Sequence, residues 1–203
     1  MPASLRAIQS APGTADTAAW EQQLVERIRA GDGDAFDALV LHFTRPLRAY
    51  VTGVVASEAA AEELVQDVFL NIWRRREAWH VRSNLRSYLF QAAHNAALVH
   101  ARRGRVTDRW KRGVIARNEV PVMGTRDEPA DRRAEVADLD TALRHAIDRL
   151  PVRCRQVAIL RFIHDLSYPD VAMVMGVTVK AVERHAAKAL RVLRSDMGRH
   201  LGR

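Results

Sequence analysis

Apolar residues recur at steps of three and four over most of the chain, and this spacing places them on one face of a helix. In the first half the pattern predicts four helices, over about 20–28, 34–51, 57–79 and 84–103. The pattern fades between 104 and 134, and it returns in four segments at about 136–149, 152–162, 168–175 and 179–197. We therefore expect an all-α fold made of two small helical domains.

The domain boundaries follow from where this periodicity stops. Residues 1–19 are rich in Ala, Ser, Thr and Pro and carry little charge, so we expect a disordered tail. The first helical domain is predicted at 20–103. Residues 104–134 mix Val, Gly, Pro and charges of both signs without a repeat, which is typical of a flexible linker. The second domain is predicted at 135–203 and contains a helix-turn-helix.

Local signals mark where helices of the first domain begin. Gly31 and Gly33 interrupt the pattern, and Asp34 is predicted to cap the helix that follows. Ser57 is predicted to cap the third helix. On the fourth helix, the residues predicted to pack inward are Leu85, Leu89, Ala92, Ala93, Ala96 and Val99. Those predicted to face outward are Arg86, Gln91, His94, Asn95, Arg102 and Arg103.

The segment that begins at Ser167 has the pattern of a helix-turn-helix. Ser167 is a good N-cap, Pro169 suits a first turn, and Gly176 can adopt the left-handed conformation that ends a helix. Thr178 can cap the second helix, whose apolar stripe is Val182, Ala186, Ala189, Leu190 and Leu193. The opposite face carries Lys180, Glu183, Arg184, Ala187, Lys188 and Arg191. Such a helix fits a DNA major groove, and the alternative is an ordinary bundle with a solvated charged face.

Net charge adds a class of partner. The 203 residues carry a formal charge of +8, which favours an anionic partner, nucleic acid first and a membrane surface second. No apolar run approaches the roughly 18 residues of a membrane-spanning helix, and the N-terminus lacks the pattern of a secretory signal. The single cysteine, Cys154, excludes an intramolecular disulfide. It fits the reducing cytoplasm, where we expect the protein to act.

The sequence offers little for catalysis. We find no Gly-rich phosphate loop, zinc ligand set or nucleophile elbow. His164 and Asp165 form a pair that metal phosphohydrolases use, but the further ligands of such a site are missing. The run of Gly and Asp at 31–34 lacks the closing Glu of a calcium-binding loop. We predict a protein that is not an enzyme and that needs no cofactor or metal.

Four segments together resemble the extracytoplasmic-function (ECF) sigma factors, bacterial initiation factors with two helical domains. The segment at 61–70, AEELVQDVFL, resembles the helix that docks on the clamp of RNA polymerase. The segment at 88–97, YLFQAAHNAA, resembles the helix that reads and opens the −10 promoter element. LPVRCRQV at 150–157 resembles the opening of the second domain, and GVTVKAVERHAAKAL at 176–190 resembles the helix that reads the −35 element.

The resemblance implies three sets of functional residues. For polymerase binding they are Gln66, Asp67 and Asn71. For −10 recognition they are Trp79, Tyr88, Gln91, Asn95, Arg102 and Arg103, with Phe90, Arg74 and Arg75 as further candidates. For −35 recognition they are Thr178, Lys180, Glu183, Arg184, His185 and Lys188. The loop at 78–84 resembles the family's pocket for a flipped-out base.

The expected partners are core RNA polymerase and promoter DNA, with the protein a monomer when free. Residues 153–155 and 182–190 look most like the iron-starvation (FecI-like) branch, whose members answer siderophore signals through an inner-membrane regulator. An inner-membrane anti-sigma or regulator protein is therefore a candidate partner. Two alternatives stay open: a LuxR-type helix-turn-helix regulator that binds duplex DNA without polymerase, and a module whose basic face binds an acidic protein.

Overall fold

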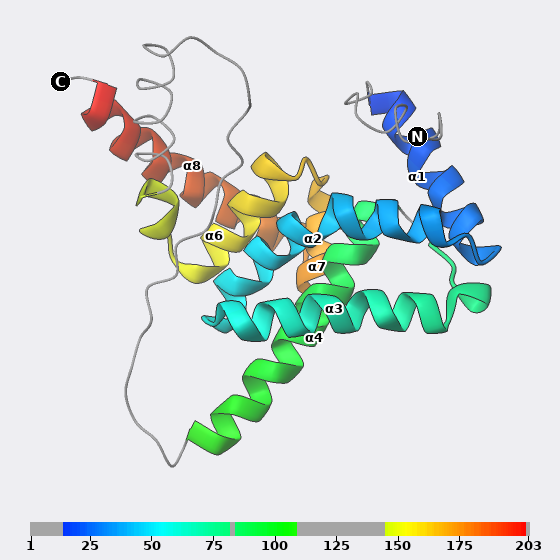
Figure 1. The fold of residues 1–203 in the computed structure, drawn as a ribbon. Helices are drawn as coiled ribbons and strands as arrows, with labels where there is room; N and C mark the ends of the chain where they lie inside the picture. The colour runs from blue at the N-terminus through cyan, green and yellow to red at the C-terminus, as the bar shows by residue number, and fades with distance from the viewer. Residues whose placement is uncertain (1–13, 82–83, 109–144, 202–203) are drawn as a thin grey trace, which may run out of the picture.

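The computed structural model describes residues 14–81, 84–108 and 145–201, and every regular element within these ranges is helical. The N-terminal helices are α1 (Thr14–Arg29), α2 (Gly33–Val55), α3 (Glu58–Arg74), the short 3₁₀-helix η2 (Arg76–Ala78) and α4 (Leu85–Asp108). The C-terminal helices are α6 (Val152–Ala158), the π-helical turn η3 (Ile159–Ile163), α7 (Tyr168–Met175) and α8 (Val179–Leu201) (Figure 1). The all-α prediction is confirmed.

The turn between α1 and α2 corrects one predicted cap. Gly31 has φ of +87°, and Asp32 follows it in an extended conformation. The Asp32 carboxylate accepts a hydrogen bond from the Ala35 amide at 3.1 Å, so Asp32 is the N-cap and Asp34 lies inside the helix. Asp32 and Asp34 flank Gly33, so the sequence offers both as caps. The extended backbone of Asp32 identifies it as the N-cap. The Ser57 cap of α3 is confirmed by its bond to the Ala60 amide at 3.3 Å.

The helix-turn-helix forms as its local signals predict. The Ser167 hydroxyl accepts from the Asp170 amide at 3.2 Å and caps α7. Gly176 has φ of +61° and ends α7 in the left-handed conformation, which costs glycine no steric strain. The Thr178 hydroxyl then accepts from the Ala181 amide at 3.3 Å and begins α8. Val182, Ala186 and Ala189 are buried along the inner face of α8.

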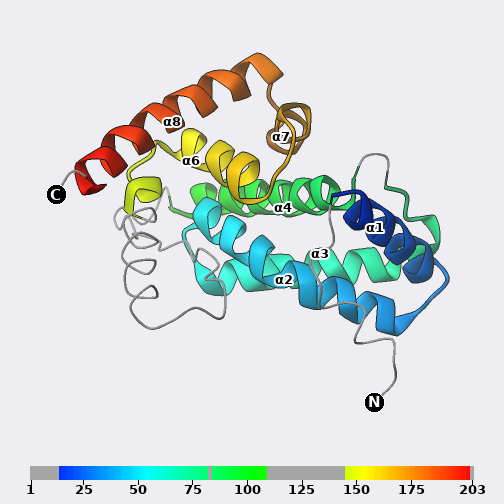
Figure 2. The ribbon, with the colours of Figure 1, turned by 90° about the horizontal axis from the view of Figure 1, so that it is seen from above.

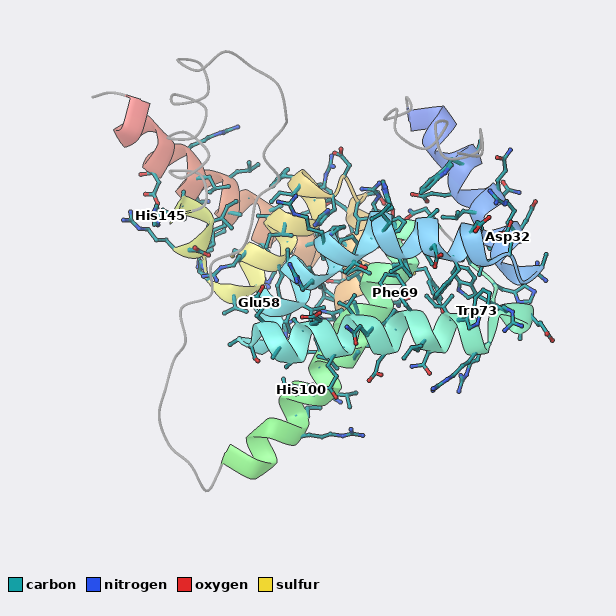
Figure 3. The ribbon with its side chains drawn as sticks, in the orientation of Figure 1. Asp32, Glu58, Phe69, Trp73, His100 and His145 are labelled. Carbon is teal, nitrogen blue, oxygen red and sulfur yellow. The ribbon has the colours of Figure 1, made fainter. Side chains whose placement is uncertain are left out.

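Helix α4 is the centre of the molecule. It packs on α2 and α3 on one side and on α7 on the other. In Figure 2, α2 and α3 lie on the lower side of α4 in the picture, and the C-terminal helices α6, α7 and α8 lie on its upper side. On the lower side Phe69 and Trp73, labelled in Figure 3, pack around Phe36 from α2 with ring centroids 6.5 and 4.8 Å away. One continuous apolar core therefore joins helices of both predicted domains.

Three predictions for α4 are wrong, and those for His94 and Phe90 fail because α4 is covered on two sides. His94 was expected to face outward, but it is only 3 % exposed, and Phe90 is fully buried. Val99 was expected to pack inward, but it is 46 % exposed. A helix covered from two sides has two buried faces, and a single apolar stripe in the sequence shows only one of them.

Two predicted boundaries shift. Helix α1 begins at Thr14, inside the segment predicted as a disordered tail, and α4 runs on to Asp108, past the predicted start of the linker at 104. Residues 1–13 of the tail, residues 109–134 of the linker and the predicted start of the second domain at 135 lie outside the described residues. None of the helices in the described part of the chain is both long and apolar enough to cross a membrane.

Candidate nucleic-acid interface

Helix α8 presents a basic face. Thr178, Lys180, Glu183, Arg184 and Lys188 are all exposed. Lys180, Arg184 and Lys188 follow one another at steps of four, so their side chains lie along the same side of the helix. Because Val182 and Ala186 hold the opposite side in the core, this side faces away from the protein. The arrangement can present several cations to a polyanion at once.

His185 differs from the other residues predicted to contact the −35 element. It is half-buried, and its Nδ1 lies 3.6 Å from the Sγ of buried Cys154 on α6. Burial lowers the pKa of His185, and the nearby charges of Arg184, Arg153 and Lys188 lower it further. The imidazole is therefore neutral at pH 7, and it lies at the edge of the basic face.

The polar face of α3 is open. Gln66, Asp67 and Asn71 are exposed, as are Glu62 and Glu63. Asp67 and Asn71 are one turn apart on the same side of the helix. Phe69 and Ile72 hold the other side of α3 against the core. This leaves an acidic and amide-bearing surface that a basic partner can approach.

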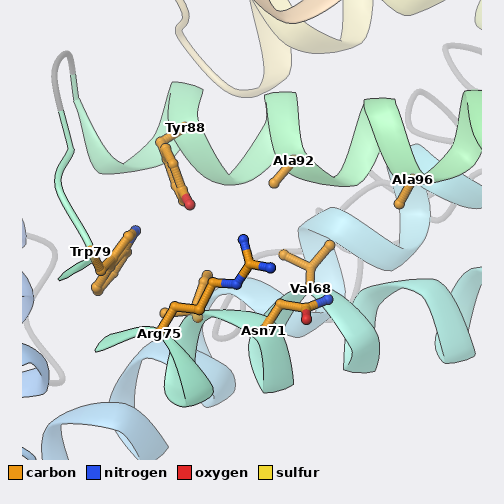
Figure 4. A pocket seen from close by; sticks show the side chains of 8 residues that line it. Val68, Asn71, Arg75, Trp79, Tyr88, Ala92 and Ala96 are labelled. Atoms are coloured by element: carbon orange, nitrogen blue, oxygen red, sulfur yellow. The ribbon is translucent and has the colours of Figure 1, made fainter. Parts of the chain in front are cut away.

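A pocket of about 230 Å³ opens between α3 and α4. It is lined by Val68, Asn71, Ile72, Arg75, Trp79, Tyr88, Ala92 and Ala96. Figure 4 shows Tyr88, Ala92 and Ala96 along α4, facing Val68, Asn71 and Arg75 across the cavity, with Trp79 closing one end. Asn71 therefore belongs both to the polar face of α3 and to this pocket. The repeat of Tyr88, Ala92 and Ala96 at steps of four is the sequence signal that marks the pocket wall.

The chemistry of the pocket is aromatic and donor-rich. The rings of Trp79 and Tyr88 lie 5.8 Å apart with an angle of 57° between their planes. Trp79 is 4 % exposed, and its indole N–H is buried without a hydrogen-bond partner among the described residues. A buried unpaired donor is costly, so an acceptor that enters the pocket satisfies it. The guanidinium of Arg75 projects into the same space (Figure 4). A planar group with acceptor atoms fits these walls.

The remaining residues predicted for −10 recognition do not gather in this pocket. Gln91 turns toward α7, where its Nε2 donates to the Met173 carbonyl at 3.3 Å. Asn95 is exposed, and Arg102 and Arg103 are exposed farther along α4. The candidate role of Phe90 in stacking on DNA is wrong in this arrangement. Its ring is buried between Tyr50, at 5.4 Å, and His164, at 4.5 Å.

Two buried histidines lie in the core near these rings, His94 beside Tyr50 and His164 beside Phe90. His94 Nδ1 and the Tyr50 hydroxyl are hydrogen-bonded at 2.8 Å, and burial lowers the pKa of His94. Burial and the charge of Arg86 lower the pKa of His164 to about 4, against a smaller opposing effect of Asp165. His164 thus serves packing between α4 and the C-terminal helices. No cluster of three or more potential metal ligands occurs in the described ranges.

Comparisons with known proteins agree with this arrangement. The family model "Sigma-70 region 2" matches residues 39–107, and the model "Sigma-70, region 4" matches residues 140–193. Together they match more than half of the chain. The chain is 29 % identical over 172 residues to the RNA polymerase sigma-H factor of Pseudomonas aeruginosa, a match that covers 83 % of this chain and 89 % of that protein.

Two further similarities are informative. The chain is 28 % identical over 183 residues to the ECF RNA polymerase sigma factor BldN of Streptomyces coelicolor, with 90 % of this chain and 67 % of that protein covered. Its fold is similar to the sigma factor RpoE from Bartonella quintana, solved in complex with the anti-sigma factor NepR. That similarity has a TM-score of 0.61 at 21 % identity and covers 80 % of this chain and 96 % of that chain. The order of regions 2 and 4, the helix-turn-helix and these relatives lead to one conclusion. The chain belongs to the ECF-type sigma factors of RNA polymerase.

Proposed function

We propose that this sigma factor directs core RNA polymerase to its promoters by dividing the work between its two regions. Region 4 reads the −35 element as duplex DNA, and region 2 captures a base of the −10 element as the strands separate. The observation that carries the proposal is the pocket between α3 and α4, in a chain that also has a basic recognition helix. Among the described residues, the buried Trp79 N–H at this pocket has no hydrogen-bond partner.

For the −35 element, α8 enters the major groove with its basic face. Arg184 makes a bidentate contact to guanine in this proposal, while Lys180 and Lys188 neutralise phosphates; the exposure of all three supports these roles. Thr178 and the N-terminus of α8 bind a phosphate of the DNA backbone. Glu183 either accepts a hydrogen bond from cytosine or forms an ion pair with a neighbouring basic side chain. His185 supports the helix through its contact with Cys154.

For the −10 element, an unstacked base enters the pocket beside Trp79 and Tyr88. The aromatic rings replace the stacking that the base loses, and the Trp79 N–H supplies a hydrogen bond to its edge. Arg75 and Asn71 are then the side chains that distinguish one base from another. Arg102 and Arg103, exposed on α4 beyond the pocket, hold the sugar–phosphate backbone.

For polymerase binding, Gln66 and Asp67 lie at the centre of the open polar face of α3. Their acidic and amide groups complement a basic surface on the clamp, and such complementarity sets orientation and association rate. The test is the pair Gln66→Ala and Asp67→Arg, which should weaken binding to core polymerase. Affinity for the −35 duplex should not change, because α8 carries no part of this face. Unchanged polymerase binding would remove both residues from the interface.

The two regions must separate for this function. In the described arrangement Gln91 is bonded to Met173, and Asn84 at the start of α4 donates to Asp170 of α7 at 3.3 Å. Each amide thus makes a hydrogen bond to α7, and this bond competes with a contact to DNA. We therefore assign the described state to the free protein and an opened state to the complex with polymerase. Gln91 reads a base edge only in the opened state, and Asn95, which is already exposed, reads another.

A regulator of the anti-sigma class is a proposed partner, because the similar RpoE fold was solved with an anti-sigma factor. Promoters of iron-uptake genes are a further proposal, and it rests only on the resemblance of residues 153–155 and 182–190 to the iron-starvation branch. Initiation in vitro from a panel of iron-regulated and unrelated promoters tests it. Equal or absent initiation on the iron-regulated set would reject this assignment.

The deciding experiment is run-off transcription with core polymerase, with and without the protein, on a library of promoter fragments. Initiation that depends on the protein supports the proposed function and yields the promoter sequence. Sequence-specific binding to duplex DNA by the protein alone, without initiation, favours a LuxR-type regulator. Substituting Trp79→Phe removes the N–H and keeps the ring, so it should reduce initiation while −35 binding persists.

A further inference from the structure

Glu21 is a carboxylate that α1 buries against the start of α4. It is 7 % exposed and lies in the middle of α1, 64 residues away in sequence from its partner. Its Oε2 accepts a hydrogen bond from the amide of Leu85, the first residue of α4, at 3.2 Å. Its Oε1 lies 3.9 Å from Nε of Arg86. A residue of one helix thus ties down the end of another.

The first turn of any α-helix has amide groups without intrahelical partners. In α4 the Asn84 side chain serves one of them, because its Oδ1 accepts from the Ser87 amide at 2.6 Å. The Glu21 carboxylate, which lies outside α4, accepts the hydrogen bond of the Leu85 amide. A carboxylate at this end is also favoured by the helix dipole, and a hydrogen bond to a charged acceptor is stronger than a neutral one. Burial raises the pKa of Glu21, and Arg86 and the amides oppose that rise.

The two acceptors connect the start of α4 to different partners. Asn84 also donates to Asp170 of α7, so its tertiary contact is lost when region 4 moves away. The bond of Glu21 joins α1 to α4 without involving region 4, so it persists. Tyr88, one turn beyond Leu85, forms a wall of the pocket between α3 and α4. Any tilt of the first turn of α4 therefore moves Tyr88 relative to Trp79.

We propose that Glu21 is a positioning residue for −10 recognition: it holds the first turn of α4, and with it Tyr88, in place once region 4 has opened. This rests on the proposed function, in which the pocket takes a −10 base. Glu21 touches no DNA in this role. It acts through Leu85 and Arg86, and it makes α1 a part of the machinery that selects the base.

The test compares Glu21→Ala and Glu21→Gln with wild-type protein, using the full chain and core polymerase. Initiation is measured on promoters that carry each of the four bases at every −10 position. We expect Glu21→Ala to lower initiation from the best promoter about three- to tenfold. It should also reduce the ratio of initiation from promoters with the preferred base to initiation from those with a disfavoured base. Glu21→Gln should lie between, because its amide oxygen still accepts from Leu85. Binding to the −35 duplex and to polymerase should stay within about twofold.

Glu26→Ala is the matched control, since Glu26 is an exposed glutamate on the same helix and its side chain accepts a long hydrogen bond from Gln22 at 3.4 Å. Hydrogen–deuterium exchange gives an independent readout, because Glu21→Ala should speed exchange of the Leu85 amide and Glu26→Ala should not. An unchanged base ratio in Glu21→Ala, or an equal loss of every activity, would overturn the inference. Failure of wild-type protein to initiate at any promoter would instead overturn the proposed function.

Discussion

The side-chain amide of Gln91 donates a hydrogen bond to the backbone carbonyl of Met173, with Nε2 and O 3.3 Å apart. Gln91 lies on the helix expected to read the −10 element, and Met173 lies on the first helix of the motif expected to read the −35 element. Beside them, Asn84 donates to Asp170 at 3.3 Å. Two hydrogen bonds therefore join α4 to α7, and in the proposed function they break when the protein engages a promoter.

Locking this contact should silence the protein. In the variant Asn84→Cys/Asp170→Cys, a reducible bismaleimide should join α4 to α7, because the two native side chains are in contact. We expect the linked protein to lose run-off transcription and to recover it when the linker is reduced. The single-cysteine variants, treated alike, control for modification, and native Cys154 is buried at 1 % exposure. Full activity of the linked form would show that separation is not required.

The buried hydrogen bond between Tyr50 and His94 should contribute measurably to stability. Both residues are nearly inaccessible, and their polar atoms lie 2.8 Å apart. Tyr50→Phe leaves the His94 nitrogen buried without this partner, which should lower the free energy of unfolding by about 1–3 kcal/mol in urea denaturation. Adding His94→Leu should recover part of the loss, because two apolar side chains leave no unpaired group. No recovery in the double variant would argue against the hydrogen bond as the cause.

Features that depend on neighbouring residues could be predicted from the sequence, and features that depend on distant contacts could not. The helix-turn-helix was predictable because Ser167, Gly176 and Thr178 act on their own neighbours through caps and a left-handed turn. Burial of Phe90 and His94 was not predictable, because their partners lie far away in the sequence: His164 packs on Phe90, and Tyr50 is hydrogen-bonded to His94. The same holds for Glu21, whose partner Leu85 belongs to another helix.

The candidate site divides in the same way. The exposed basic face of α8 follows from helical spacing alone. The pocket could not be predicted from the sequence, because its opposite walls come from two helices, α3 and α4, and Trp79 closes one end. The sequence placed Trp79, Tyr88 and Asn71 in functional sets. It did not indicate that Asn71 shares a cavity with them.

Acid should loosen the interface between α4 and the C-terminal helices through His164. The pKa of His164 is about 4 in the folded protein, below the roughly 6.5 of an exposed imidazole. A lowered pKa means that the unfolded state binds the proton more readily, so stability is complete above pH 6.5 and falls as the pH drops toward 4. Between pH 7 and 5 the expected loss from this residue is about 2 kcal/mol.

Urea denaturation at several pH values checks this. His164→Gln cannot titrate, so its stability should fall by about 2 kcal/mol less than that of wild-type protein over the same range. His94, whose pKa is also lowered by burial, accounts for part of the slope that remains. His100→Gln is the matched control, because His100 is exposed on α4 and should leave the slope as it is. Equal slopes in wild-type and His164→Gln would contradict the assignment.

Arg184 should distinguish base recognition from general attraction to DNA. It is exposed on the basic face of α8, between Lys180 and Lys188. If its guanidinium contacts a guanine, Arg184→Ala should weaken binding to the preferred −35 duplex by about 1–3 kcal/mol and relax the preference at that position only. Lys188→Ala should weaken binding to all duplexes alike and reduce the dependence on salt, as loss of a phosphate contact does.

Fluorescence anisotropy on a set of single-base duplex variants, repeated at three salt concentrations, separates the two behaviours. A uniform loss for Arg184→Ala would make it a phosphate contact, and base preference would then have to come from other residues of α8, with Glu183 the next to test.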